Sequence, residues 1–135
     1  MRLWHKDLIE VLPHKQLVGQ WRECCLIAKN ISADGTPNHL LVNRIMEYPM
    51  SHLYNYGVLV CEEMGRRGYK CDFNKFSHWF TYPHETYQVD FDDLFVNWHT
   101  HRYFWQCFYN LEEKHDCGGM SDTEWDKILI KTLNY

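Results

Sequence analysis

Polar residues gather on one face of a helix that the sequence predicts near its start. The stretch LPHKQLVGQWRECCLIAKN covers residues 12–30, with apolar residues at helical spacing along one side. Gly19 has no side chain, so it leaves a hollow that another backbone can approach closely. The face can act as the floor of a pocket with one acid and two cations, although an ordinary solvated helix face would carry the same residue types. At about 100° per residue, the residues opposite the apolar stripe are Lys15, Gln16, Gly19, Arg22 and Glu23.

The amino terminus supplies a second reactive group. The chain opens with MRLW, and Met1 should be retained because Arg2 is too large to permit its removal. The free α-amine then belongs to Met1. An α-amine has a pKa of about 8, against about 10.4 for lysine, so a useful fraction is neutral and nucleophilic near neutral pH. Met1 is therefore a candidate nucleophile, and Glu23 is a candidate acid that can accept a proton or stabilise a cationic intermediate.

Histidines and cysteines in the second half allow both a metal-binding and a structural interpretation. His99 and His101 resemble a metal pair with Cys107, or with His115 and Cys117. On a helix the two histidines diverge by about 200°, which makes a shared ion difficult. We therefore predict structural or surface histidines, with no metal and no other cofactor.

Aromatic residues in the same region also have two interpretations. They could stack on nucleic-acid bases, but aromatic side chains at this density more often form a core. We favour the core. The residues are Trp98, Tyr103, Phe104, Trp105, Phe108 and Tyr109.

These groups must be positioned by helices, because strand signals are few. The pattern predicts helices over 12–30 and 51–69, a loop at 32–38 and a short helix at 39–47. Ser51 is the expected cap of the second long helix, and Gly68 its C′ residue. A long helix is expected from 92 to 115, followed after a capping box at 121–124 by a last helix to about Leu133. We read a mainly α, compact, single-domain fold over residues 1–135.

Composition bounds the class of protein. The 135 residues are 45% hydrophobic and 16% aromatic, which is ample for one core. No apolar run is long enough to span a membrane, and no signal peptide is evident, so we expect a cytoplasmic protein with reduced thiols and no membrane partner. The net charge of −4 argues against nucleic acid. However, residues 1–70 carry nine lysines and arginines against seven acids, whereas residues 71–135 carry five against eleven. An anionic ligand should therefore meet the first half.

Several motifs of the first half occur in the order of a known family. MRLW and LPHKQLVGQWRE resemble the pyrimidine-dimer DNA glycosylases of the phage endonuclease V type and their bacterial relatives. PNHLLVNRIME, with His39 and Arg44, resembles the second, histidine-containing motif of that family, and VCEEMGRRGY resembles the end of its long middle helix. The resemblance covers roughly residues 1–70 and fades beyond them.

The resemblance implies a helical fold in which the N-terminal segment threads against the first helix. It implies a DNA glycosylase with abasic-site lyase activity on damaged double-stranded DNA. The terminal amine, here of Met1, would attack C1′ of the damaged nucleotide and form an imine, and Glu23 would support the intermediate and the β-elimination that nicks the strand. The DNA-binding residues implied are Arg2, Lys15, Gln16, Arg22, His39 and Arg44.

Departures from the family pattern keep an alternative open. No second arginine follows the Arg22–Glu23 pair, and Lys15 and Gln16 replace a polar pair of the family. The second half is acidic where the phage relative is basic, so DNA affinity should be lower than in that relative. The alternative is a non-catalytic helical relative that binds nucleic acid or protein through the groove around Gly19. The sequence does not indicate an oligomeric state.

Overall fold

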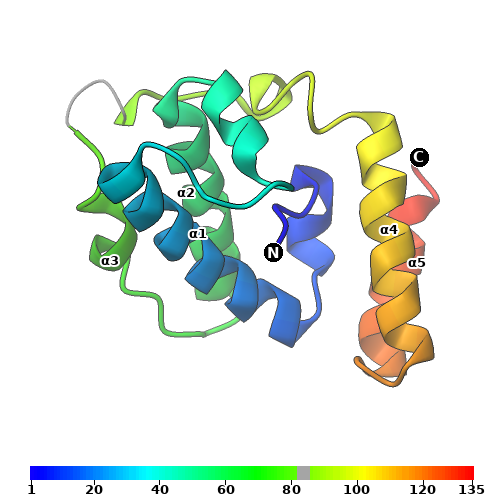
Figure 1. Ribbon diagram of the computed structural model, residues 1–135. Helices are drawn as coiled ribbons and strands as arrows, with labels where there is room; N and C mark the ends of the chain where they lie inside the picture. Colours follow the sequence, from blue (N-terminus) through cyan, green and yellow to red (C-terminus); the bar gives the residue numbers. More distant parts are fainter. Residues whose placement is uncertain (82–85) are drawn as a thin grey trace.

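The computed structural model describes residues 1–81 and 86–135, which form helices and loops without strands (Figure 1). The mainly α fold predicted from the sequence is confirmed. Within the described ranges, no helix is both long and apolar enough to cross a bilayer. The α-helices are α1 (His14–Asp34), α2 (Met50–Arg66), α3 (Asn74–Ser77), α4 (His101–Asp116) and α5 (Asp122–Thr132). The 3-10 helices are η1 (Lys6–Val11), η2 (Asn43–Glu47) and η4 (Phe91–Asp93).

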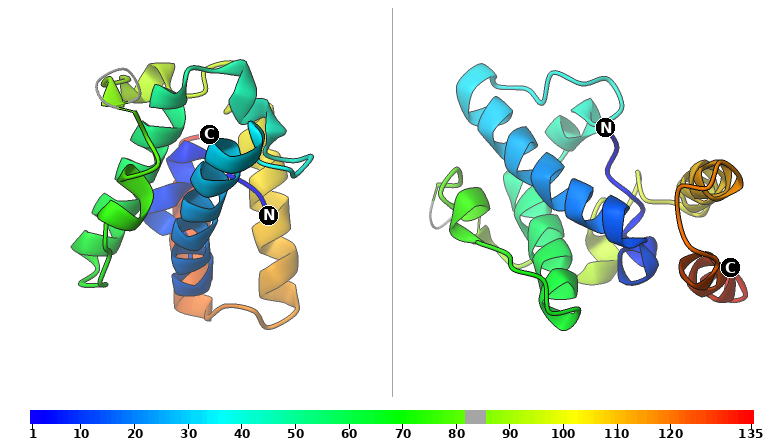
Figure 2. Two further views of the ribbon diagram at one scale, coloured as in Figure 1. Left: turned by 60° about the vertical axis from the view of Figure 1, so that its left-hand side comes forward. Right: turned by 90° about the horizontal axis from the view of Figure 1, so that it is seen from below.

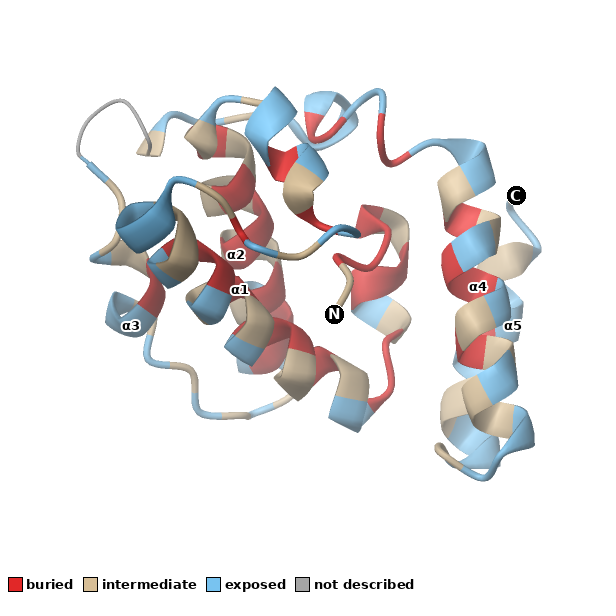
Figure 3. Ribbon diagram, viewed as in Figure 1, coloured by how far each residue is buried: buried red, intermediate tan, exposed pale blue. Residues whose placement is uncertain are grey.

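The centre of the core lies between α1 and α2, which pack along their apolar stripes (Figure 3). The stripe predicted for the first helix is confirmed, and α2 buries a stripe of the same kind. Burial of such side chains removes apolar surface from water and is the main force that holds the two helices together. The buried stripe residues are Leu17, Trp21, Cys24 and Ala28 on α1, and Leu53, Gly57, Val60 and Met64 on α2.

Gly57 allows the ring of Phe76 on α3 to pack directly against α2. A Cβ atom at position 57 would lie 2.3 Å from Cε2 of Phe76, whose side chain is fully buried. We therefore expect Gly57→Ala to lower the free energy of unfolding by about 1–3 kcal/mol in urea titration. Gly19→Ala is the matched control, because nothing lies within 4 Å of that Cβ. It should stabilise α1 by about 0.5–1 kcal/mol, and equal effects of the two substitutions would contradict the packing argument.

Helix boundaries in the first half differ from the expectations at three places. The loop predicted from residue 32 begins only at Gly35, which ends α1 with a positive φ of 74°. The short helix expected at 39–47 is a hydrogen-bonded turn followed by η2 at 43–47. Ser51 does not cap α2. Pro49 occupies the N-cap position, and Ser51 is buried in the first turn. Gly68 follows the C-cap residue with φ 78°, as predicted.

The long helix predicted from residue 92 begins only at His101. Contacts with distant residues hold the preceding segment in a path that is not α-helical. Nζ of Lys6 donates to the carbonyl oxygens of Phe91 (2.6 Å), Asp92 (3.3 Å) and Leu94 (2.8 Å). Phe95 adopts a φ of 50°, and its N–H donates to Nδ1 of His52 at 3.1 Å. Thr100 then caps α4, with its hydroxyl oxygen accepting from the N–H of Tyr103.

The second half contributes both core and surface. The predicted core role is confirmed for Trp98, Phe104 and Phe108, which are buried. Tyr103 and Trp105 are partly buried and pack against the core, whereas Tyr109 is exposed. The capping box predicted at Ser121 and Glu124 is formed and opens α5. All six cysteines are free thiols.

The N-terminal segment lies between α1 on one side and α4 on the other (Figures 1 and 2). It enters η1, which contacts both α2 and α5.

Candidate functional site

Gln20 on α1 fixes the path of the N-terminal segment. Its side chain is 1% exposed. The amide oxygen accepts from the N–H of Trp4 at 2.7 Å, and the amide nitrogen donates to the carbonyl oxygen of Arg2 at 3.0 Å. The same nitrogen donates to Oε2 of Glu23 at 3.2 Å. One buried amide thus joins the backbone of the N-terminal segment to the carboxyl group.

Two tyrosines complete the hold on this segment. The hydroxyl of Tyr56 on α2 lies 2.6 Å from the carbonyl oxygen of Trp4 and 2.8 Å from the amide oxygen of Gln20, and it donates its one hydrogen between these acceptors. The hydroxyl of Tyr103 on α4 donates to the carbonyl oxygen of Leu3 at 2.6 Å. The carbonyl oxygens of residues 2–4 and the N–H of Trp4 therefore have partners on α1, α2 and α4.

Glu23 is half-buried, and its carboxyl group faces the N-terminal segment. Burial raises the pKa of Glu23 above its ordinary value. The positive N-terminal amine opposes this rise most strongly, followed by a hydrogen bond from the backbone of Arg2 and by the charges of His39 and Lys114. The carboxyl group of Glu23 therefore shares one electrostatic environment with the terminal amine.

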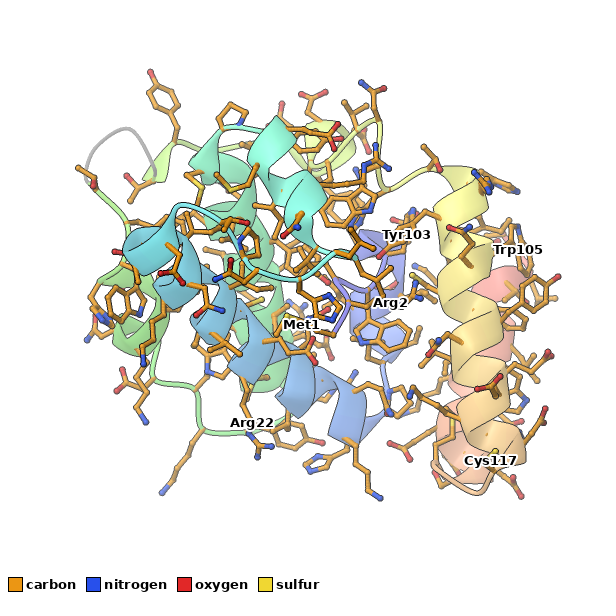
Figure 4. The ribbon with its side chains drawn as sticks, viewed as in Figure 1. Met1, Arg2, Arg22, Tyr103, Trp105 and Cys117 are labelled. Atoms are coloured by element: carbon orange, nitrogen blue, oxygen red, sulfur yellow. The ribbon has the colours of Figure 1, made fainter. Side chains whose placement is uncertain are left out.

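The two arginines nearest in sequence to the terminal amine and to Glu23 are Arg2 and Arg22, and they point in different directions. The guanidinium carbon of Arg2 lies 5.7 Å from the ring centre of Trp4 and 5.9 Å from that of Tyr103. Nη1 of Arg2 also approaches Sγ of Cys107 at 3.8 Å. Figure 4 shows Met1 and Arg2 on the side of α1 that faces α4, whereas Arg22 projects from α1 away from Met1.

The sequence-predicted residues thus divide into two groups. Met1, Arg2, Glu23 and His39 come together around the N-terminal segment. Lys15 and Arg22 are exposed on other parts of the α1 surface.

Gln16 is half-buried on α1, and Arg44 is an exposed residue of η2. Oε1 of Gln16 is buried and has no hydrogen-bond partner among the described residues. Arg44 pairs with Glu47 at 3.2 Å, donates to the carbonyl oxygen of Asn97 at 3.4 Å and stands 5.9 Å from the ring centre of Trp98.

Sequence reasoning missed Gln20, Tyr56, Tyr103 and Lys114. A signal for Gln20 was present, because residues 16, 20 and 23 follow an i, i+4, i+7 pattern and fall within about 60° on a helical wheel. A polar stripe next to an apolar one indicates a buried polar contact. Arg22 lies about 100° from Glu23 on the same wheel, which explains why it points elsewhere. No local signal marked the tyrosines or Lys114, because their role depends on tertiary packing.

An amine and a carboxyl group in this arrangement suit nucleophilic attack with proton transfer. The amine is attached to a backbone that three helices hold in place, so its position is preorganised. A carboxyl group with a raised pKa can take up and release a proton closer to neutral pH than an ordinary glutamate. Among the described residues, no three His, Cys, Asp or Glu side chains converge in a way that could hold a metal ion.

We expect Gln20→Met to loosen the N-terminal segment. Methionine has a similar length but leaves the N–H of Trp4 and the carbonyl oxygen of Arg2 without their partner, at a cost of about 1–3 kcal/mol for each buried group. Urea unfolding should show the loss, and the amide hydrogen of Trp4 should exchange faster by NMR. Gln88→Met, at an exposed position, is the control. Unchanged exchange at Trp4 in Gln20→Met would show that the segment is held by other contacts.

Comparison with known proteins places this arrangement in a family. A family model described as pyrimidine dimer DNA glycosylase matches residues 1–77, which include η1, α1, α2 and α3. No curated protein and no solved structure matches the chain. Since the family model covers more than half of the 135 residues, the chain belongs to the pyrimidine dimer DNA glycosylase family.

Proposed function

We propose that this protein, acting as one domain over residues 1–135, cleaves a glycosidic bond of a pyrimidine dimer in double-stranded DNA and then nicks the strand. The α-amine of Met1 is the nucleophile, and Glu23 is the acid–base group. The amine forms a bond to C1′ of the damaged nucleotide as the bond between C1′ and the base breaks, and the base leaves with the electron pair and takes a proton. Opening of the sugar ring gives an imine, and removal of a proton from C2′ expels the 3′-phosphate.

One observation carries the proposal. The amide of Gln20 bonds both to the carbonyl of Arg2 and to the carboxyl group of Glu23, so the start of the chain is held beside that acid. Glu23 can stabilise the cationic imine when ionised and can move the proton of C2′. The raised pKa of Glu23 supports the second role.

The charged and polar residues around this centre are proposed to bind the DNA backbone. Arg2, His39 and Arg44 would face the strand near the lesion, and Lys15, Gln16 and Arg22 would extend the contact along α1. Phosphate contacts of this kind fix the position of a protein on DNA and make its affinity dependent on salt. A moderate salt dependence is expected, since the whole chain has a net charge of −4.

Borohydride trapping tests the reaction class. Duplexes that contain either a pyrimidine dimer or an abasic site are mixed with the protein in the presence of sodium borohydride, which reduces an imine to a stable amine. We expect a covalent protein–DNA adduct with both duplexes and none with undamaged duplex. Binding without any adduct would favour the non-catalytic alternative.

A further inference from the structure

Two leucines beside the proposed site are exposed without a partner among the described residues. Leu40 is 86% and Leu41 is 53% exposed. They lie side by side in the turn at 39–42, directly after His39 and before Arg44. Single exposed leucines are common on protein surfaces, but this pair lines a groove of about 410 Å³ together with Arg44, Arg102, Tyr103 and Gln106.

The turn that carries the leucines is firmly anchored. The N–H groups of Val42 and Asn43 donate to the carbonyl oxygen of His39 at 3.0 and 2.9 Å. The side-chain oxygen of Asn43 in turn accepts from the N–H of His39 at 3.1 Å. Val42 and Ile45 are fully buried beneath the turn. The two leucines are therefore exposed on a turn whose backbone is hydrogen-bonded and whose neighbouring side chains are buried.

The charge of the groove suits a polyanion. Its two charged lining residues are Arg44 and Arg102, and no acid lines it. Arg44 has one acidic partner, Glu47, outside the lining. Among the described residues the side chain of Arg102 makes no hydrogen bond or ion pair, and it is exposed at the start of α4. A phosphate could bind at either side of the leucines without displacing a buried contact.

The groove is continuous with the N-terminal segment. Tyr103 lines the groove, and its hydroxyl holds the carbonyl oxygen of Leu3 at 2.6 Å. The guanidinium of Arg2 stands over the same ring. A ligand bound in the groove would therefore lie next to the start of the chain, where the proposed nucleophile is located (Figure 4).

We propose that Leu40 and Leu41 are an apolar wedge that enters the DNA duplex beside the lesion, while Arg44 and Arg102 hold the flanking phosphates. The inference rests on the proposed function and names the part of the duplex that the protein deforms. Leucines inserted between base pairs unstack them and kink the duplex, and this reduces the further cost of extruding a nucleotide. Arg102 and Gln106 lie beyond the residues that the family model matches, so the second half of the chain would help to form the DNA-binding surface.

The decisive variant is the double substitution Leu40→Ala/Leu41→Ala. Because both side chains are exposed, thermal unfolding should match the wild type. Excision from dimer-containing duplex under single-turnover conditions should fall about tenfold or more, since the variant no longer lowers the cost of unstacking the bases beside the lesion. Trapping on an abasic duplex should change far less, because no base has to be extruded there. The control is Ile130→Ala/Leu133→Ala, at residues 64% and 80% exposed on or just after α5, which should behave as wild type on both duplexes.

A second measurement separates failure of the wedge from failure of the proposed function. A duplex with 2-aminopurine next to the lesion becomes more fluorescent when that base unstacks, and this requires binding only. The wild type should raise the emission, and the double leucine variant should not. If the double leucine variant excises the lesion and raises the emission as well as the wild type does, the wedge is overturned and the proposed function is not. Suppose that the wild type forms no adduct but raises the emission, and that the double leucine variant does not raise it. The wedge then stands, and the glycosylase proposal fails. Three other outcomes would each contradict the wedge. They are equal losses of excision on the dimer duplex and of trapping on the abasic duplex, absence of DNA binding by the wild type, and self-association of the wild type that the substitutions abolish.

Discussion

A short peptide added before Met1 is expected to abolish the covalent adduct with both damaged duplexes. The extension converts the α-amine into an amide, which has no nucleophilic lone pair to attack C1′. The fold should tolerate the addition. The hydrogen bonds that hold the segment involve the backbone of residues 2–4, and Met1 is only partly buried. DNA binding by the extended protein should therefore persist while borohydride trapping is lost.

The same peptide placed after Tyr135 is the matched control. The ring of Tyr135 stacks on Phe104 with ring centres 3.6 Å apart, and an addition beyond it leaves that contact in the chain. This protein should form adducts as the wild type does. A trapped adduct with the N-terminally extended protein would move the nucleophile to another amine. Lys114 would then be the first to test, because its charge also acts on Glu23.

The sequence predicted the helices more reliably than their ends. The apolar stripes of α1 and α2 follow the helical period, so the burial of residues such as Leu17 and Val60 could be foreseen. The start of α4 could not. Residues 92–100 have helix-compatible types, but Lys6 and His52 bind their backbone from far along the chain. Long-range contacts of this kind override local preference and leave no local signature.

The candidate site shows the same division. Glu23 and Met1 were singled out by their chemistry and by the family resemblance, both of which are properties of the sequence. Gln20, which connects them, is not among the sequence-predicted residues, although it belongs to the same polar stripe of α1 as Gln16 and Glu23. Tyr103 comes from the half of the chain outside the family match, so only the folded structure brings its hydroxyl to the N-terminal segment.

Replacing Glu23 by glutamine should remove most of the strand cleavage while it preserves DNA binding. An acid–base group of this kind typically contributes about 10²–10⁴-fold to the rate, and an amide cannot take up the proton of C2′ or stabilise the imine with a full charge. Its oxygen can still accept the hydrogen bond from Gln20, so the N-terminal segment should stay in place. Affinity should be unchanged or slightly higher, because a negative charge near the phosphates is lost. Gel assays of nicking and of binding measure the two properties separately.

The stability of Glu23→Gln should depend on pH in a direction that the raised pKa fixes. In the folded protein Glu23 keeps its proton to a higher pH than the ordinary value of 4.5, so the folded state binds more protons in that interval. The favourable contribution of Glu23 to the free energy of unfolding is complete below the pKa of this group in the unfolded chain. It is lost as the pH rises through the pKa of Glu23 in the folded protein. Near neutral pH the half-buried carboxylate then opposes folding, and the neutral amide removes that cost. Glu23→Gln should therefore raise the melting temperature relative to the wild type at pH 7.5 more than at pH 4.

A larger rise at pH 4 than at pH 7.5 would show that the carboxylate is stabilised by its cationic neighbours and is not poised for proton transfer. Full nicking activity in Glu23→Gln would remove this residue from the reaction altogether.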